Sequence, residues 1–201
     1  TSLTLTACDM SDNTACGAKI RGKVDGLHVN GGHFDRNVHG LYQEPGAAGL
    51  PIINSVISGA SFIGNAQKGI YSEQMSNTAL TNLTVSDNGN DPTRLWGTGI
   101  DINLKKGDYS NLSISNCVVT NCGKGDAANG AGIAVKARGT GNDPSYSATP
   151  ATLNGVSVSG CTISNCQEGI RLGEPGKYNT GPTSVTLSSS FDANVEQDIR
   201  N

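Results

Sequence analysis

The chain has 201 residues, enough for one domain with a sizeable core, and carries a net charge of -3 at neutral pH. Aromatic residues make up 4% and charged residues 15%, whereas glycine occurs 27 times, so short strands with tight turns are favoured over a helical bundle. The charge argues against nucleic acid as a partner, and no stretch approaches the roughly 20 apolar residues of a membrane span.

The first expected strand lies at the start of the chain, where Leu3 and Leu5 alternate with polar residues. The chain thus begins within a repeat, and no secretory signal opens it. We expect residues 1–201 to form a single domain that is part of a longer protein.

A short phrase recurs seven times along the chain. It consists of a small residue, any residue and a large apolar residue, followed three positions later by a polar residue or cysteine, as in Ala60-Ser61-Phe62 with Asn65. Because repeats of this kind stack, we expect the large apolar residues to form one internal column: Met10, Phe34, Phe62, Val85, Val119, Ile163 and Phe191.

A glycine followed by an apolar residue comes a few positions after most of these phrases. The pairs are Gly40-Leu41, Gly69-Ile70, Gly99-Ile100, Gly132-Ile133 and Gly169-Ile170. Period-two alternation before, within and after each phrase predicts three short strands per coil and a triangular cross-section.

The spacing between phrases is unequal. Phe62 and Val85 are 23 residues apart, whereas Val119 and Ile163 are 44 apart, with the surplus in polar, glycine-rich stretches near 89–98, 123–131 and 139–154. We expect loops extruded from one corner of a constant coil, and such a corner often borders a binding face.

The run Asn116-Cys117-Val118-Val119, followed by Gly132-Ile133, resembles the repeat of the pectate-lyase-like superfamily. The resemblance covers essentially the whole chain and implies an all-β fold: a right-handed single-stranded parallel β-helix with about seven coils, three parallel sheets and long loops at one corner. The superfamily includes polysaccharide lyases, pectin hydrolases, alginate epimerases, phage tailspikes and bacterial surface proteins, so it indicates the fold far more strongly than the activity.

Six cysteines leave several states open. Cys117 and Cys161 occupy equivalent places in consecutive coils, as do Cys122 and Cys166, and stacked neighbours lie within disulfide range. We favour buried free thiols over stacked disulfides, with a zinc site the least favoured. Cys8 and Cys16 can pair only with each other.

Alternation after each glycine places a mixed set of side chains on one outward face, which we expect to be exposed. Tyrosine rings beside carboxylates and basic groups suit an extended polysaccharide, although a merely solvated strand face is also consistent with them. The predicted substrate-binding residues are Tyr42, Glu44, Tyr71, Glu73, Asp101, Asn103, Lys105, Lys136, Arg138 and Arg171. Because the coils stack, residues at equivalent positions should form columns along this face, and we expect Arg21 of the first coil to lie in the same column as Tyr42 and Tyr71.

Catalysis is less clearly indicated, and catalytic residues stay unassigned. Lyases of the superfamily use a lysine or arginine as base with calcium on acidic or amide residues, and Lys136 with Arg138 is a similar arrangement. The motifs of its epimerases, pectin hydrolases and pectate lyases are absent. We expect His28 and His33 at the surface, no metal site, and no Ser–His–Asp arrangement.

Two functions compete. The first is an extracellular module of a bacterial surface, adhesive or fibre-forming protein that binds polysaccharide, or stacks on copies of itself or on neighbouring domains. The alternative is a lyase or epimerase acting on an acidic, uronate-containing glycan, with calcium as a cofactor only in that case. We expect an extracellular or cell-surface location, and we disfavour an ice-binding solenoid because the predicted face is too charged.

Overall fold

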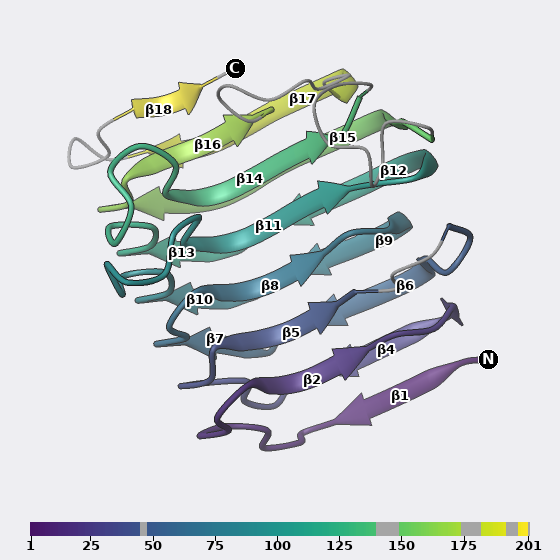
Figure 1. The fold of residues 1–201 in the computed structure, drawn as a ribbon, viewed down its shortest axis with the longest axis horizontal. Coiled ribbons are helices and arrows are strands. Elements are labelled where there is room, and N and C mark those ends of the chain that lie inside the picture. The colour runs from purple at the N-terminus through teal and green to yellow at the C-terminus, as the bar shows by residue number, and fades with distance from the viewer. Residues whose placement is uncertain (45–47, 140–148, 174–181, 192–196, 201) are drawn as a thin grey trace.

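The computed structural model describes residues 1–44, 48–139, 149–173, 182–191 and 197–200, and every element in them is a strand (Figure 1). The strands lie roughly parallel in a stack from one terminus to the other, and every pairing between them is parallel. The predicted parallel β-helix is confirmed. No helix within these ranges is long and apolar enough to cross a membrane.

Three walls surround the core. The first wall holds β1 (Leu3–Thr6), β3 (Val24–Asp25), β4 (Leu27–Asn30), β6 (Ile52–Ser58), β9 (Met75–Thr81), β12 (Gly107–Ser115), the start of β15 (Ala151–Ser164) and most of β17 (Pro182–Phe191). The second wall holds β7 (Ser61–Ile63), β10 (Thr84–Ser86), β13 (Val118–Thr120) and the end of β15. The third wall holds β2 (Cys16–Ile20), β5 (His39–Gln43), β8 (Lys68–Ser72), β11 (Thr98–Leu104), β14 (Ala131–Ala137), β16 (Glu168–Leu172) and β18 (Gln197–Arg200).

The backbone hydrogen bonds join these three walls into two sheets, whereas three sheets were predicted. The third wall is a seven-stranded sheet, whereas the first and second walls belong to one eleven-stranded sheet. They are joined because β15 runs through the corner between them, pairing with β12 along its first part and with β13 at its end.

The long connections leave two corners, so the prediction of a single corner is wrong. Residues 87–97 and 121–130 connect the second wall to the third, whereas residues 138–150 connect the third wall to the first. Both corners flank the third wall. The corner between the first and second walls stays short in every coil, because its backbone geometry is fixed.

Residues in the left-handed backbone region mark that corner and two other fixed points of the coil, one within the first wall and one directly after the second wall. They recur at intervals of five, and one coil has Asn111, Asn116 and Asn121 with φ of 54° at each. The neighbouring coils have Asn77, Asn82 and Asp87, and Gly155, Gly160 and Asn165, at the same places. Asparagine, aspartate and glycine tolerate this conformation better than other residues, so the chain can bend at the same point in each coil.

The predicted internal column is confirmed where side chains are described. Phe34, Phe62, Val85, Val119 and Ile163 are all buried, and Val85 lies in register between Phe62 and Val119. The rings of Phe34 and Phe62 stack with centroids 5.0 Å apart. Met10 is partly buried against the same core. Phe191 pairs with Ile163 through the backbone, and its side chain lies outside the described residues.

The polar ends of the repeated phrases form a buried ladder of asparagines. The backbone N–H of Asn37 donates to the side-chain oxygen of Asn65 at 2.9 Å, and that of Asn65 donates to Asn88 at 2.9 Å. The following glycines pack closely over this ladder, since a Cβ on Gly69 would lie 2.6 Å from the carbonyl oxygen of Gly99. A larger residue there would force the coils apart.

Cysteines continue the ladder in the later coils. All six cysteines are free thiols, and Cys117, Cys122, Cys161 and Cys166 are buried. Cys117 contacts Cys161 and Cys122 contacts Cys166, as predicted from their equal spacing. Each thiol also reaches a backbone carbonyl, as Cys117 does to Ser115 at 3.2 Å. They therefore serve as small core residues.

Replacing Phe62 by alanine should lower the free energy of unfolding by about 3–5 kcal/mol, because it leaves a cavity beside Phe34 in the central coils. The matched control is Val118→Ala, which removes an apolar side chain that is 47% exposed on the outside of the second wall. Denaturant-induced unfolding measures both. Equal losses in the two variants would contradict the assigned core.

Candidate functional site

The outward side chains of the third wall fall into columns. Tyr42 lies opposite Tyr71 on the next strand, Tyr71 opposite Asp101, and Asn103 opposite Lys136. The predicted columns are therefore correct from the second coil onward. In the first coil the residue opposite Tyr42 is Lys19, so the placement of Arg21 in that column is wrong by two residues.

The expectation that this face is exposed is also wrong for most of it. The buried members are Tyr71, Asp101, Asn103, Lys136, Arg138 and Arg171, whereas Tyr42, Glu44, Glu73 and Lys105 are partly buried. The side chains pack on one another, and the connection at residues 87–97 carries an indole ring over them. Trp96 has its ring centroid 5.9 Å from the Lys136 ammonium and 6.0 Å from the Arg171 guanidinium.

Two connections hold this tryptophan in place. The backbone N–H of Trp96 donates to a carboxylate oxygen of Asp126 at 2.9 Å, which ties residues 87–97 to residues 121–130. The backbone of Trp96 is in the left-handed region with φ of 65°, which an aromatic residue seldom adopts. The Asp126 hydrogen bond helps to stabilise this conformation.

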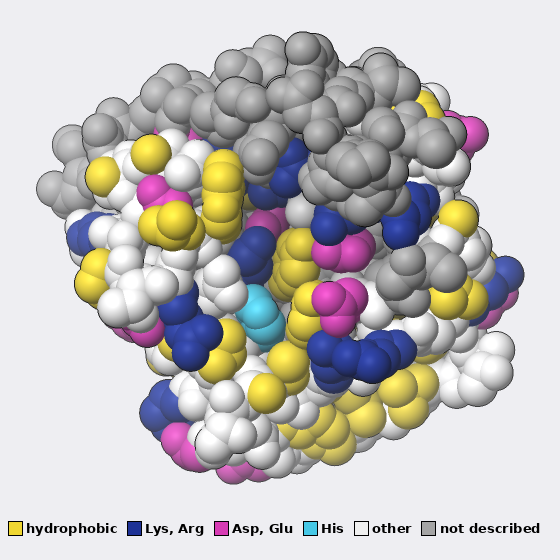
Figure 2. All heavy atoms as spheres, viewed as in Figure 1, with side chains coloured by type: hydrophobic (Ala, Val, Ile, Leu, Met, Phe, Trp, Pro, Cys, Tyr) yellow, Lys and Arg dark blue, Asp and Glu magenta, His cyan; other side chains and the backbone are white. Residues whose placement is uncertain are grey.

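A cleft of about 360 Å³ opens on the third wall. On the side shown in Figure 2, basic, acidic and hydrophobic side chains gather around a hollow in which a histidine is visible. The cleft is lined by four cations, three aromatic rings, one imidazole and two amides: Lys68, Lys105, Lys136, Arg138, Tyr42, Tyr71, Trp96, His39, Gln67 and Asn103. No carboxylate is among the described lining residues, and the four cations outnumber the two carboxylates that pair with them, Asp101 and Glu73. The cleft therefore has a net positive charge beside flat rings.

A buried carboxylate lies beneath the cleft and pairs with two of its lysines. Asp101 is fully buried, forms a hydrogen-bonded ion pair with Lys68, and has its other oxygen 3.2 Å from the Lys136 ammonium. Burial alone raises the pKa of Asp101, but Lys136 and Lys68 outweigh it, so the pKa is lowered. Asp101 therefore holds both ammonium groups in position at the cleft.

A second network lines one side of the cleft. The Tyr71 hydroxyl donates to Glu73 at 2.7 Å, and the Lys105 ammonium donates to the same oxygen at 2.6 Å. Asn103 donates to the Tyr71 hydroxyl at 3.1 Å and accepts from the Arg138 guanidinium at 3.0 Å. Burial, with Glu73 and Asp101 nearby, raises the pKa of Tyr71 well above its usual value, so this phenol stays protonated.

His39 is neutral at physiological pH. Burial, reinforced by Lys68 and Arg94, lowers its pKa from 6.5 to about 4. Its ring packs against Tyr42 at 4.8 Å and Tyr71 at 6.0 Å, and its buried Nδ1 has no hydrogen-bond partner among the described residues. His39 therefore adds a neutral imidazole to the lining of the cleft.

The structure brings together six of the ten predicted substrate-binding residues as cleft lining: Tyr42, Tyr71, Asn103, Lys105, Lys136 and Arg138. Asp101 and Glu73 support them. Glu44 pairs with Lys19 at 3.0 Å, and Arg171 donates to the carbonyl of Asn129, so neither lines the cleft. The structure alone reveals Lys68, His39, Gln67 and Trp96. His39 and Lys68 immediately precede the glycines of the repeat, which is a signal that could have found them.

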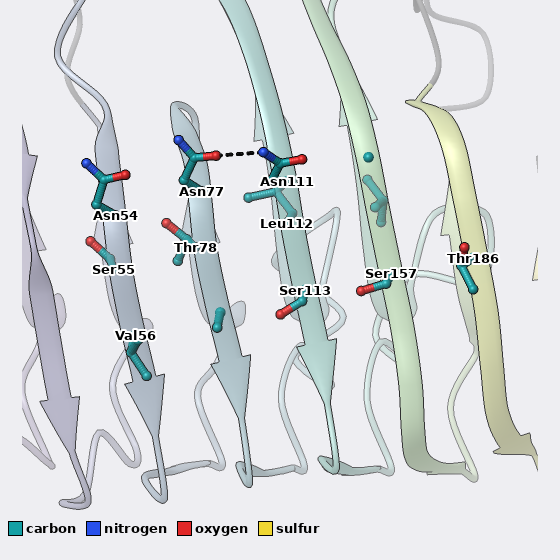
Figure 3. A pocket seen from close by; sticks show the side chains of 13 residues that line it. Asn54, Ser55, Val56, Asn77, Thr78, Asn111, Leu112, Ser113, Ser157 and Thr186 are labelled. Atoms are coloured by element: carbon teal, nitrogen blue, oxygen red, sulfur yellow. Dashed lines mark hydrogen bonds between the residues drawn. The ribbon is translucent and has the colours of Figure 1, made fainter.

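A larger groove of about 650 Å³ lies on the first wall (Figure 3). Asn54, Asn77 and Asn111 stand in a row across adjacent strands, and Asn111 donates to Asn77 at 2.9 Å. The rest of the lining is serine, threonine and small or apolar residues, with no titratable group among the described lining residues. It offers far less chemistry than the smaller cleft on the third wall.

A serine, histidine and aspartate do meet on the second wall, contrary to the sequence prediction. The Ser61 hydroxyl lies 2.9 Å from His33 Nδ1 and donates to Asp35 at 3.0 Å. They meet because His33 and Ser61 bridge adjacent coils on the same wall. The carboxylate contacts the serine and the same ring nitrogen, so the relay order of an acyl-transfer triad is missing. His28 and His33 are exposed, as predicted.

A family model described as the right-handed beta helix region matches residues 1–145. The chain belongs to this right-handed β-helix family. No curated protein and no solved structure matches it. Family membership fits a carbohydrate-related or surface β-helix protein in general terms, and the ligand has to be inferred from the cleft.

The resemblance to lyases implies calcium, and the residues of the cleft do not fit it. Calcium takes six to eight oxygen ligands, commonly including several carboxylates. The described residues contain no group of three histidine, cysteine, aspartate or glutamate side chains that could hold a metal ion. Asp101 and Glu73, the carboxylates nearest the cleft, are engaged by lysines.

Replacing Asp101 by asparagine should lower the free energy of unfolding by about 3–5 kcal/mol, because Lys68 and Lys136 would lose their buried counter-charge. The control is Asp87→Asn, an exposed carboxylate at a left-handed position that asparagine tolerates, with an expected change within about 0.5 kcal/mol. A small loss in Asp101→Asn, measured by denaturant unfolding, would show that the ion pairs are not formed.

The stability of the protein should depend on the protonation of His39. The imidazole of the unfolded chain binds a proton at higher pH than that of the folded protein, so protonation favours the unfolded state. The free energy of unfolding should therefore be unaffected by His39 above about pH 6.5 and should decrease as the pH falls toward 4. Unfolding curves across that range should show wild type losing on the order of 2 kcal/mol more than His39→Gln. His28→Gln, at an exposed site, should behave as wild type. If the free energy of unfolding fell equally with pH in wild type and His39→Gln, the lowered pKa of His39 would be contradicted.

Proposed function

We propose that the protein binds an acidic, uronate-containing polysaccharide in the cleft of the third wall. The observation that carries the proposal is the lining itself: four cations and three aromatic rings, with no carboxylate among its described residues. Sugar rings pack against aromatic faces, and carboxylates bind lysine and arginine through charge-assisted hydrogen bonds. A neutral glycan could pack against the rings but would form no charge-paired hydrogen bonds with the cations.

The polymer would run along the axis of the solenoid. Tyr42 and Tyr71 stack with centroids 5.1 Å apart on adjacent coils, and Lys105 and Arg138 follow along the same face. Successive coils lie ~4.8 Å apart, so a chain crossing the strands meets a new set of side chains at each step. Many contacts of modest strength would then add up.

Such a ligand supports a place outside the cell or at its surface, in a bacterial adhesive or fibre-forming protein of the pectate-lyase-like type. Neighbouring domains or further copies of the chain are a second class of proposed partner. Within the described part of the chain, β1 and β2 stand at the ends of their sheets and offer a strand edge for pairing.

One observation favours a lyase or epimerase as the second candidate. Both reactions begin when a base removes the proton beside the uronate carboxylate, and His39 places a neutral imidazole in the cleft lining beside the cationic cluster. Lys136 suits this role less well because its ammonium is paired with Asp101. New ultraviolet absorbance from unsaturated ends would identify a lyase, and solvent deuterium entering the polymer without cleavage would identify an epimerase.

Binding should be measurable through the fluorescence of Trp96, the single tryptophan of the chain. Titration with oligogalacturonate should shift its emission, and a neutral oligosaccharide of equal length should bind more weakly. Arg138→Gln should raise the dissociation constant about tenfold, because one charge-assisted hydrogen bond is lost. Tyr42→Ala should also weaken binding.

The matched control is Lys23→Gln, which removes the same charge from an exposed position outside the cleft. It should leave the dissociation constant near that of the wild type. Equal effects of Arg138→Gln and Lys23→Gln would mean that the glycan responds only to net charge. No effect of Arg138→Gln or Tyr42→Ala would move the site elsewhere.

A further inference from the structure

We infer that glycan binding in this cleft is independent of calcium, because side-chain cations occupy the positions that a divalent ion would need. The inference rests on the proposed function. It also departs from the resemblance to calcium-dependent lyases, whose acidic and amide residues hold the metal ion. In this chain the acidic and amide residues of the predicted face each lie against a basic side chain.

The four carboxylate and amide residues of the predicted face show the same arrangement. Glu44 lies 3.0 Å from the Lys19 ammonium, and Glu73 lies 2.6 Å from that of Lys105. Asp101 is held between two lysines, and the side-chain oxygen of Asn103 accepts from Arg138 at 3.0 Å. The oxygens that could ligate calcium are therefore already neutralised or hydrogen-bonded by the protein.

Displacing these partners would be unfavourable. Asp101 has no exposed surface, and the ammonium groups beside it are buried as well, with Lys136 1% and Lys68 6% exposed. A divalent cation at Asp101 would lie next to both ammonium groups and be repelled by them. Moving a lysine aside would leave a buried charge without its counter-charge.

The same cations can do what calcium does for a uronate. A bound carboxylate must have its charge neutralised and its oxygens hydrogen-bonded, and lysine and arginine provide both. Lys68, Lys105, Lys136 and Arg138 line the cleft and are fixed by Asp101, Glu73 and Asn103 beneath or beside them. The binding site is thus assembled before the ligand arrives.

Two properties follow for the ligand complex. Its affinity should not change when divalent ions are removed, because no ion bridges protein and glycan. Its affinity should fall as sodium chloride is added, because salt screens the attraction between the charges of the glycan and those of the cleft.

The experiment titrates the intact chain with oligogalacturonate and follows Trp96 emission in three buffers: with a chelator, with calcium chloride, and with a chelator plus added sodium chloride. We expect dissociation constants within about twofold of each other in the first two buffers and a clearly weaker complex in the third. Lys136→Gln should weaken binding about tenfold in both chelator and calcium, whereas Lys23→Gln should not.

A second measurement, made without glycan, tests whether the protein itself binds calcium. The thermal unfolding midpoint of the protein should be the same in chelator and in calcium, since an ion that binds only the folded state would raise it. A raised midpoint in calcium would overturn the inference.

The outcomes separate the two proposals. Binding that needs calcium, or that is more than about tenfold tighter with it, would overturn the inference and leave the proposed function standing. Absence of binding in all three buffers would overturn both.

Discussion

In-register pairing between successive coils decides which side chains in this protein become neighbours. Each strand hydrogen-bonds to the equivalent strand ~4.8 Å away, so a residue meets its counterpart from the next coil. Inside, this stacks like on like, as with Phe34 on Phe62 and Asn65 on Asn88. Outside, it brings charges together: Glu44 and Glu73 fall on adjacent coils of one column, and each takes a lysine as partner.

The cleft follows from this constraint. The lysines and arginine come from three successive coils and reach across them to a few acceptors, which fixes their positions without a loop-borne motif. Asp101 is central because it holds two lysines from two different coils. The connections on the flanking corner then add Trp96, so a rigid stack of strands carries the charges and an inserted segment supplies a ring. Burying charges is unfavourable unless they are paired, and Asp101 with Lys68 and Lys136 meets that requirement.

Much of the fold could be predicted from the sequence because the repeat encodes burial directly. The position of Phe62 in its phrase was enough to place it in the core, and the equal spacing of Cys117 and Cys161 was enough to place them in contact. The placement of Arg21 failed because the glycine of the first coil, Gly17, is followed by the small residue Ala18 instead of a large apolar one. Ala18 pairs with Leu41, so Lys19 takes the position opposite Tyr42. The corners were also encoded, by asparagine or glycine at intervals of five such as Asn111, Asn116 and Asn121, and this signal was missed. The burial of Lys136 and Arg171 could not be predicted, since it depends on where Trp96 folds back over the wall. Whether this face is solvated or forms a cleft therefore depends on the connection at residues 87–97, which carries Trp96, and not on the repeated phrase.

Mapping the ligand by nuclear magnetic resonance tests the central claim most directly. Amide shifts of the isotope-labelled protein would be recorded as oligogalacturonate is added. The account predicts that the changes concentrate on β5, β8, β11 and β14 and on the indole of Trp96, and that they persist in a chelator. Changes centred instead on the groove of the first wall, around Asn77 and Ser113, would contradict it.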